Sequence, residues 1–152
     1  MYIKRSGRNG TLLIGVLIMI IILTSCGLSD WAYDKLPNGY EIWRINSEDI
    51  ELIKRKGDST DLKIDRYILE FCYNDSYIGI KRLMIDQNIP YQNVHIEEMD
   101  KSHPAYYLVD ALNDVILGPF TAEKYEDQIE SLKVENMCDW IKTVPTPEGA
   151  VW

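Results

Sequence analysis

The sequence has few of the residues on which most catalytic and metal sites depend. Its 152 residues include only two histidines, His95 and His103. The glycines are scattered and form no phosphate-binding loop, and there is no Gly-x-Ser-x-Gly elbow for nucleophilic catalysis. The spacing of the two histidines matches no zinc motif, so a solvated polar loop is the favoured interpretation. These absences predict a protein that is not an enzyme and that needs no cofactor or metal.

The sequence also lacks an apolar run long enough to span a bilayer comfortably. Leu12–Leu23 is an unbroken apolar run of twelve residues, whereas a spanning helix needs roughly 20. A basic segment with three positive charges precedes this run, and the small residues Thr24 and Ser25 follow it. A basic start, a short apolar core and a small-residue exit are typical of a secretory signal peptide.

A cysteine at the end of this segment changes the prediction from a secreted to an anchored protein. Leu23-Thr24-Ser25-Cys26 resembles the lipobox of bacterial lipoproteins. The resemblance implies that a peptidase cuts between Ser25 and Cys26 and that the Cys26 thiol carries a diacylglyceryl group. Two acyl chains are enough for stable anchoring. We therefore expect a lipid-anchored protein on the extracytoplasmic face of the cell membrane, with an uncleaved signal anchor as the alternative.

Positive charge is scarce in the predicted mature chain. The whole sequence has a net charge of −8, and removing residues 1–25, with three positive charges and no negative ones, leaves a mature chain of 127 residues at −11. Such a surface repels phosphates, so nucleic acid and anionic headgroups are not expected partners. Solubility alone explains the charge, and the length suits one domain.

Only two cysteines remain once Cys26 is lipidated, and their pairing is open. Cys72 and Cys138 would lie in a compartment where a disulfide could form. Cys72 also lies within an alternating apolar pattern, which equally favours a buried free thiol. The spacing of the two residues does not decide between these alternatives.

Alternating apolar residues predict antiparallel strands along most of the mature chain. A first hairpin is expected over residues 40–45 and 50–55, followed by a polar loop at 56–61. The clearest hairpins are residues 67–73 with 77–83 and residues 106–111 with 115–117, and 138–144 suggests a last strand. Thr121 is a plausible N-cap for a helix whose apolar face includes Tyr125, Ile129 and Leu132.

These elements predict an α+β fold: an antiparallel, meander-like sheet of about five or six strands with one C-terminal amphipathic helix packed on it. We expect a signal-peptide helix at residues 1–25, a tether at 26–36, a single domain at 37–144 and a loose tail at 145–152. The lipobox, Leu-Pro-Asn-Gly-Tyr at 36–40, Tyr-Tyr-Leu-Val-Asp at 106–110 and Gly-Pro-Phe-Thr at 118–121 resemble an uncharacterised family of small lipoproteins from spore-forming, low-GC Gram-positive bacteria. The resemblance implies a cell-surface location and supplies no activity and no catalytic residues.

Aromatic residues with polar tips are the remaining feature. The chain has four tryptophans and ten tyrosines but two phenylalanines. Packing within strands is the favoured explanation, and Trp31 and Trp43 near the tether are the candidates for a binding surface. The expected function is a non-catalytic module that binds an envelope protein or cell-wall component. A small envelope enzyme with a dispersed site and an inhibitor or immunity-type lipoprotein are the alternatives.

Overall fold

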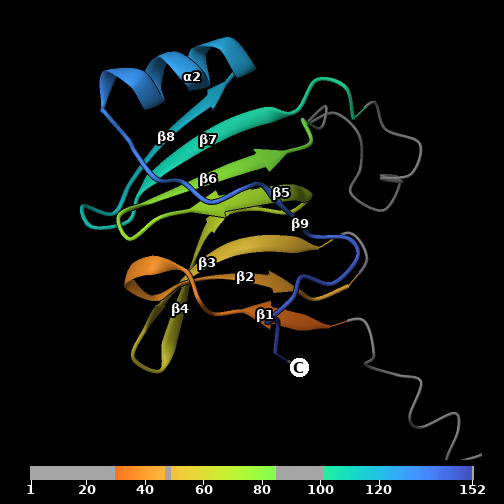
Figure 1. Ribbon diagram of the computed structural model, residues 1–152. Helices are drawn as coiled ribbons and strands as arrows, with labels where there is room; N and C mark the ends of the chain where they lie inside the picture. The colour runs from red at the N-terminus through yellow and green to blue at the C-terminus, as the bar shows by residue number, and fades with distance from the viewer. Residues whose placement is uncertain (1–29, 47–48, 85–100, 152) are drawn as a thin grey trace, which may run out of the picture.

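The structure is a computed structural model in which residues 30–46, 49–84 and 101–151 are described. Its strands are antiparallel and form two sheets that pack against each other, with one short helix at one end (Figure 1). The α+β class and the antiparallel pairing agree with the sequence prediction. The single sheet expected from the sequence is wrong, because the strands divide into a four-stranded and a five-stranded sheet.

The first sheet has the strand order β1-β2-β3-β4, and a short 3-10 helix, η1, connects its first two strands. The bounds are β1 Trp31–Tyr33, η1 Pro37–Gly39, β2 Tyr40–Arg44, β3 Ile50–Lys56 and β4 Ser59–Ile64. The polar loop expected at 56–61 is instead a tight turn at Gly57, whose φ is +60°, followed by β4. Part of the expected tether is also ordered, since β1 lies within it.

The second sheet has the order β8-β7-β6-β5-β9, so its central strands come from the two hairpins that the sequence indicated most clearly. The bounds are β5 Ile68–Tyr73, β6 Tyr77–Arg82, β7 Ala105–Asp110, β8 Val115–Phe120 and β9 Ile141–Lys142. The last strand lies inside the predicted range of 138–144 but is shorter than expected.

One hydrophobic core fills the space between the two sheets. Ile42, Leu52 and Ile64 lie opposite one another in the first sheet and are buried. Phe71 and Ile80 form the corresponding pair in the second sheet and are fully buried. Because side chains alternate along a strand, every second residue of both sheets faces this core. The remaining side chains form an outer face on each sheet.

The helix α2, Ala122–Ser131, packs on β7 and β8. The Thr121 side chain accepts a hydrogen bond from the Lys124 backbone N–H at 3.4 Å, as the predicted N-cap requires. Tyr125 is the buried residue of the helix, whereas Leu132, expected on the same apolar face, is 42% exposed.

The C-terminal segment joins the two sheets instead of forming a loose tail. The Thr143 hydroxyl donates to the carbonyls of Ile68 and Leu69 in the second sheet, at 2.8 and 2.9 Å. Val151 then exchanges two backbone hydrogen bonds with Ala32 of β1, at 2.8 and 2.7 Å. The segment therefore covers the outer edge of the first sheet.

Candidate functional site

The outer face of the first sheet, which we call the open face, is the candidate site. Glu41, Ile53 and Leu62 share this face because they lie opposite one another in the strand register. Leu62 is exposed, whereas Glu41 and Ile53 are buried. Trp43 and Arg55 lie two residues along their strands from Glu41 and Ile53 and therefore point to the same side. The one α-helix of the described residues packs on the other sheet.

A buried carboxylate organises the polar part of the open face. Glu41 is only 6% exposed, and it accepts hydrogen bonds from Arg55 Nε at 2.6 Å and Arg55 Nη2 at 3.1 Å. It also accepts one from Trp43 Nε1 at 2.6 Å. The Arg55 hydrogen bond holds the pKa of Glu41 below its ordinary value, so the carboxylate stays charged near neutral pH. This network fixes the positions of both the indole and the guanidinium.

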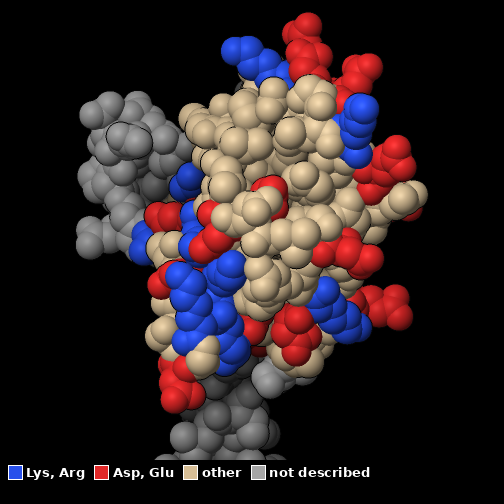
Figure 2. All heavy atoms as spheres, turned by 90° about the vertical axis from the view of Figure 1, so that its left-hand side faces the viewer, with Lys and Arg blue, Asp and Glu red and all other residues tan. Residues whose placement is uncertain are grey.

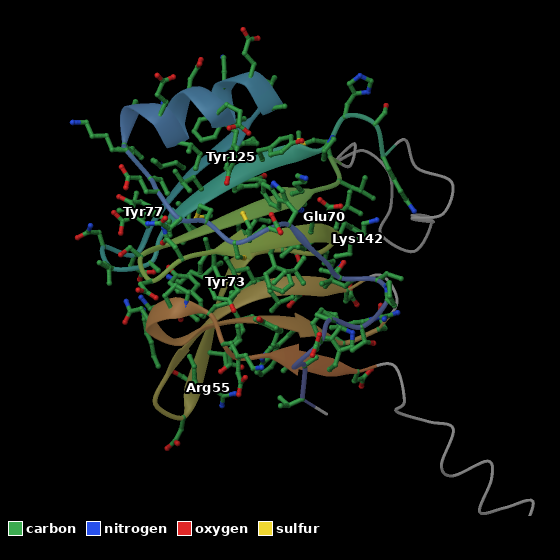
Figure 3. All side chains as sticks on the ribbon, viewed as in Figure 1. Arg55, Glu70, Tyr73, Tyr77, Tyr125 and Lys142 are labelled. Atoms are coloured by element: carbon green, nitrogen blue, oxygen red, sulfur yellow. The ribbon has the colours of Figure 1, made fainter. Side chains whose placement is uncertain are left out.

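The groups held by Glu41 remain accessible. The Arg55 side chain is 53% exposed, and Figure 3 shows it at the outer surface, on the side of the molecule away from α2. Its guanidinium lies 5.9 Å from the centroid of the half-buried Trp43 ring. Leu62, on the neighbouring strand, is 55% exposed. Tryptophan and arginine dominate the binding energy of many protein interfaces, especially when they are fixed in advance.

The two tryptophans that were predicted as candidates for a binding surface lie in different parts of the fold. Trp43 lies on the open face, whereas Trp31 is 3% exposed and belongs to the core between the sheets. The sequence prediction for Trp31 is wrong because β1 is part of the first sheet and directs this indole inward. Glu41, Arg55 and Leu62 were not predicted from the sequence as site residues. The alternation Glu41-x-Trp43 was the available signal, but it becomes informative only when β3 is paired beside β2.

The outer face of the second sheet, which we call the covered face, is closed by α2. Tyr125 reaches down from the helix toward the sheet (Figure 3), where Gly79 leaves room for its hydroxyl. A Cβ at Gly79 would lie 2.3 Å from Tyr125 Oη and 2.7 Å from Cys72 Sγ. Burial raises the pKa of the Cys72 thiol to about 12 and raises that of Tyr125 as well. Both groups are therefore neutral and unreactive near neutral pH.

A cation, a carboxylate and a tryptophan also meet on the covered face. Lys81 Nζ lies 2.6 Å from Glu70 Oε2 and 4.0 Å from the centroid of the Trp140 ring. Trp140 packs in turn against Tyr125 and Tyr106, with ring centroids 5.9 and 6.2 Å apart. Lys81 and Glu70 are 19% and 24% exposed. The ammonium of Lys81 itself occupies the aromatic cluster, so this arrangement is best explained as packing.

The two cysteines considered for a disulfide are free thiols in the structure. Cys72 is buried beneath Tyr125, whereas Cys138 is exposed and its Sγ accepts a hydrogen bond from the Tyr73 backbone N–H at 3.1 Å. Their pairing in an oxidising compartment stays a prediction.

The remaining predicted site residues, Ser25, Cys26, His95 and His103, are not among those that the structure places on either face. Ser25, Cys26 and His95 lie outside the described residues. His103 is exposed, and its Nδ1 lies 2.7 Å from the Ser102 hydroxyl oxygen. Within the described ranges, no group of three or more histidine, cysteine, aspartate or glutamate side chains could hold a metal ion. Nor does any helix there have the length and apolar character needed to cross a membrane.

Residues 37–142 match the model of a family described as protein of unknown function (DUF3997). The chain belongs to this family. The match runs from η1 through β9, so the DUF3997 region contains both faces described above, while β1 and the C-terminal segment lie outside it. No curated protein and no solved structure matches the chain.

Proposed function

We propose that this DUF3997 protein is a lipid-anchored, extracytoplasmic binding module without catalytic activity. Its partner is a protein or another component of the cell envelope. The observation that supports binding is the open face, on which Glu41 fixes an accessible Trp43 and Arg55 beside an exposed leucine. The lipobox at Leu23–Cys26 supports the anchor.

The open face leaves an aliphatic side chain accessible beside its polar network, since Leu62 is 55% exposed. Arginine and tryptophan side chains normally lose rotamer freedom on binding. Here Glu41 restrains Arg55 and Trp43 before any partner arrives. The arrangement fits a preorganised binding surface better than a catalytic site, which would need a group that can exchange protons near neutral pH.

The anchor is tested by growing cells with an alkyne-labelled fatty acid and detecting the label on the purified protein. We expect labelling of the wild-type protein and none of Cys26→Ala, with cleavage before residue 26 confirmed by mass spectrometry. An unlabelled, uncleaved wild-type protein would contradict the anchor.

The binding function is tested by in-cell crosslinking and capture with the lipidated protein as bait. The matched baits are Trp43→Ala on the open face and Leu132→Ala, which removes an exposed leucine elsewhere. We expect one envelope component to be enriched with the wild type and with Leu132→Ala but lost with Trp43→Ala. Equal capture by all three baits, or none above background, would contradict the proposal.

A further inference from the structure

We propose that the free edge of β4 binds an extended segment of the partner protein by strand addition. The segment carries an aliphatic side chain beside Leu62 and an acidic side chain two residues away, beside Thr60. This inference deepens the proposed function, because β4 forms the border of the open face and an added strand would extend that face.

The other sheet edges in the described part of the chain offer shorter or less regular backbone than β4 does. Val151 pairs with the outer edge of β1. Pro119, which has no N–H to donate, interrupts β8 directly after Gly118, and β9 is only two residues long. Chains commonly protect sheet edges against pairing in these ways. Among the described residues, β4 pairs with β3 alone and is six residues long.

The register shows which backbone groups of β4 are available. A two-residue turn at Gly57-Asp58 makes Lys56 and Ser59 a hydrogen-bonded pair. Hydrogen-bonded and non-hydrogen-bonded pairs alternate in an antiparallel ladder. The N–H and C=O groups of Thr60 and Leu62 therefore point away from β3, toward the free edge. The register shift in the ladder comes only after Leu62, so Ser59–Leu62 is a regular template.

The charged side chains of β4 do not guard this edge. Lysine on an edge strand usually hinders pairing, but Lys63 turns inward, with 16% of its side chain exposed and its Nζ 3.0 Å from Asp114 Oδ1. Asp61 Oδ2 lies 2.6 Å from Lys56 Nζ. Leu62 is left as the accessible side chain beside the edge, and it would form a continuous row with Ile53 and an aliphatic residue of the added strand.

The charges next to this edge favour an acidic residue in the partner. Arg55 lies opposite Thr60 on the open face, and Arg55 and Lys56 are both about half exposed. Figure 2 shows basic side chains on the lower part of the molecule, with acidic side chains beside them, at the level at which the β3–β4 hairpin lies in Figure 1. Glu41 engages only Nε and Nη2 of Arg55, so the Nη1 group can still donate to a carboxylate of the partner.

A second copy of the chain is a poorer occupant. Each mature copy has a net charge of −11, so two copies repel each other. Pairing of β4 from two copies would also bury much less accessible surface than the roughly 1,200 Å² of a stable protein–protein interface. Short extended peptides, in contrast, bind sheet edges through main-chain hydrogen bonds with side-chain contacts at alternate positions.

The test uses the mature lipidated protein in detergent micelles and two fluorescent seven-residue probe peptides. One peptide is Thr-Thr-Val-Thr-Glu-Thr-Thr, and the other has the valine and glutamate exchanged to allow for either strand direction. We expect at least one peptide to give saturable binding by fluorescence anisotropy. Replacing its glutamate by lysine should weaken binding at least five-fold. Alternate backbone N–H groups of the bound peptide would point toward β4. N-methylation of the peptide at those residues should abolish binding, and N-methylation at the intervening residues should not.

Variants of the protein test whether the peptide binds at the edge of β4. Leu62→Lys should weaken peptide binding at least ten-fold, and Thr60→Pro should abolish it, while the matched variant Leu132→Lys should leave it unchanged. Circular dichroism and thermal unfolding check that the variants fold. If Thr60→Pro does not fold, the comparison between Leu62→Lys and Leu132→Lys decides the outcome.

Three results would overturn the proposal: no saturable binding of either peptide up to about 1 mM, binding that Leu62→Lys does not change, or a wild-type dimer that Leu62→Lys dissociates. The last result would assign the edge to a second copy. Failed peptide binding combined with Trp43-dependent capture in cells would reject strand addition and leave the proposed function standing.

Discussion

The two outer faces carry the same three kinds of side chain in opposite settings. On the open face a cation (Arg55), a carboxylate (Glu41) and an indole (Trp43) meet at the surface. On the covered face the corresponding three residues are Lys81, Glu70 and Trp140, and Lys81 contacts both of the others. The two sets differ in what packs on them: Trp140 of the second set packs against Tyr125 of α2, whereas no described helix packs on the first set.

Tyr125→Ala on the covered face should have the largest effect on stability. Tyr125 is 3% exposed and fills the space between α2 and the sheet. Truncating a large buried aromatic side chain costs about 3–5 kcal/mol. The free energy of unfolding, measured by urea denaturation, should fall by that amount. A loss below about 1 kcal/mol would mean that α2 is not needed to close the covered face.

Gly79→Ala tests the same packing from the other side. The added methyl group would overlap Tyr125 Oη and Cys72 Sγ, at 2.3 and 2.7 Å. Overpacking of this kind costs about 1–3 kcal/mol. Combining Gly79→Ala with Tyr125→Phe removes the hydroxyl that the methyl meets, so denaturation of the double variant should show a smaller loss than the sum of the single losses. Simple additivity would contradict the close contact.

Arg55→Ala should reveal the charge network of the open face through its pH dependence. Removing Arg55 leaves the buried Glu41 carboxylate without its main partner, so the free energy of unfolding should fall at neutral pH. The folded pKa of Glu41 lies below its ordinary value of 4.5, so the stabilisation is fully present above pH 4.5 and is lost as the pH falls through the lowered pKa. Denaturation curves of wild type and variant should therefore converge in acid. A pH-independent difference would contradict this assignment.

Leu62→Ser should have the smallest effect on stability, because this side chain is 55% exposed. Exposed substitutions usually change the free energy of unfolding by less than about 0.5 kcal/mol. If the open face serves binding, the variant should nevertheless capture less partner than the wild type does. A large stability loss measured by urea denaturation would instead give Leu62 a structural role.

Local patterns in the sequence were sufficient for much of the fold. The two hairpins of the second sheet were predicted because both strands of each alternate regularly and a polar turn separates them. Thr121 was identified as an N-cap because a hydroxyl before an amphipathic segment satisfies the first helical N–H groups. These signals depend on residues that are close in sequence.

Features that depend on distant residues could not be predicted. β4 was missed because Ser59, Thr60 and Asp61 are polar, and an edge strand needs only one apolar side. The packing of the two sheets involves contacts between residues far apart in sequence, such as Tyr33 and Phe71, whose ring centroids lie 5.0 Å apart. The C-terminal segment was predicted to be loose because its prolines and glycine indicate turns, although Val151 pairs with a strand more than a hundred residues earlier.

The central claim is that the open face, and not the covered face, recognises a partner. The most direct measurement is quantitative capture in cells with two baits of matched stability, Trp43→Ala on the open face and Lys81→Ala on the covered face, after denaturation has confirmed that both remain folded. We predict that capture is lost with Trp43→Ala and retained with Lys81→Ala. Capture that survives Trp43→Ala and disappears with Lys81→Ala would contradict the account and would move the binding surface to the second sheet.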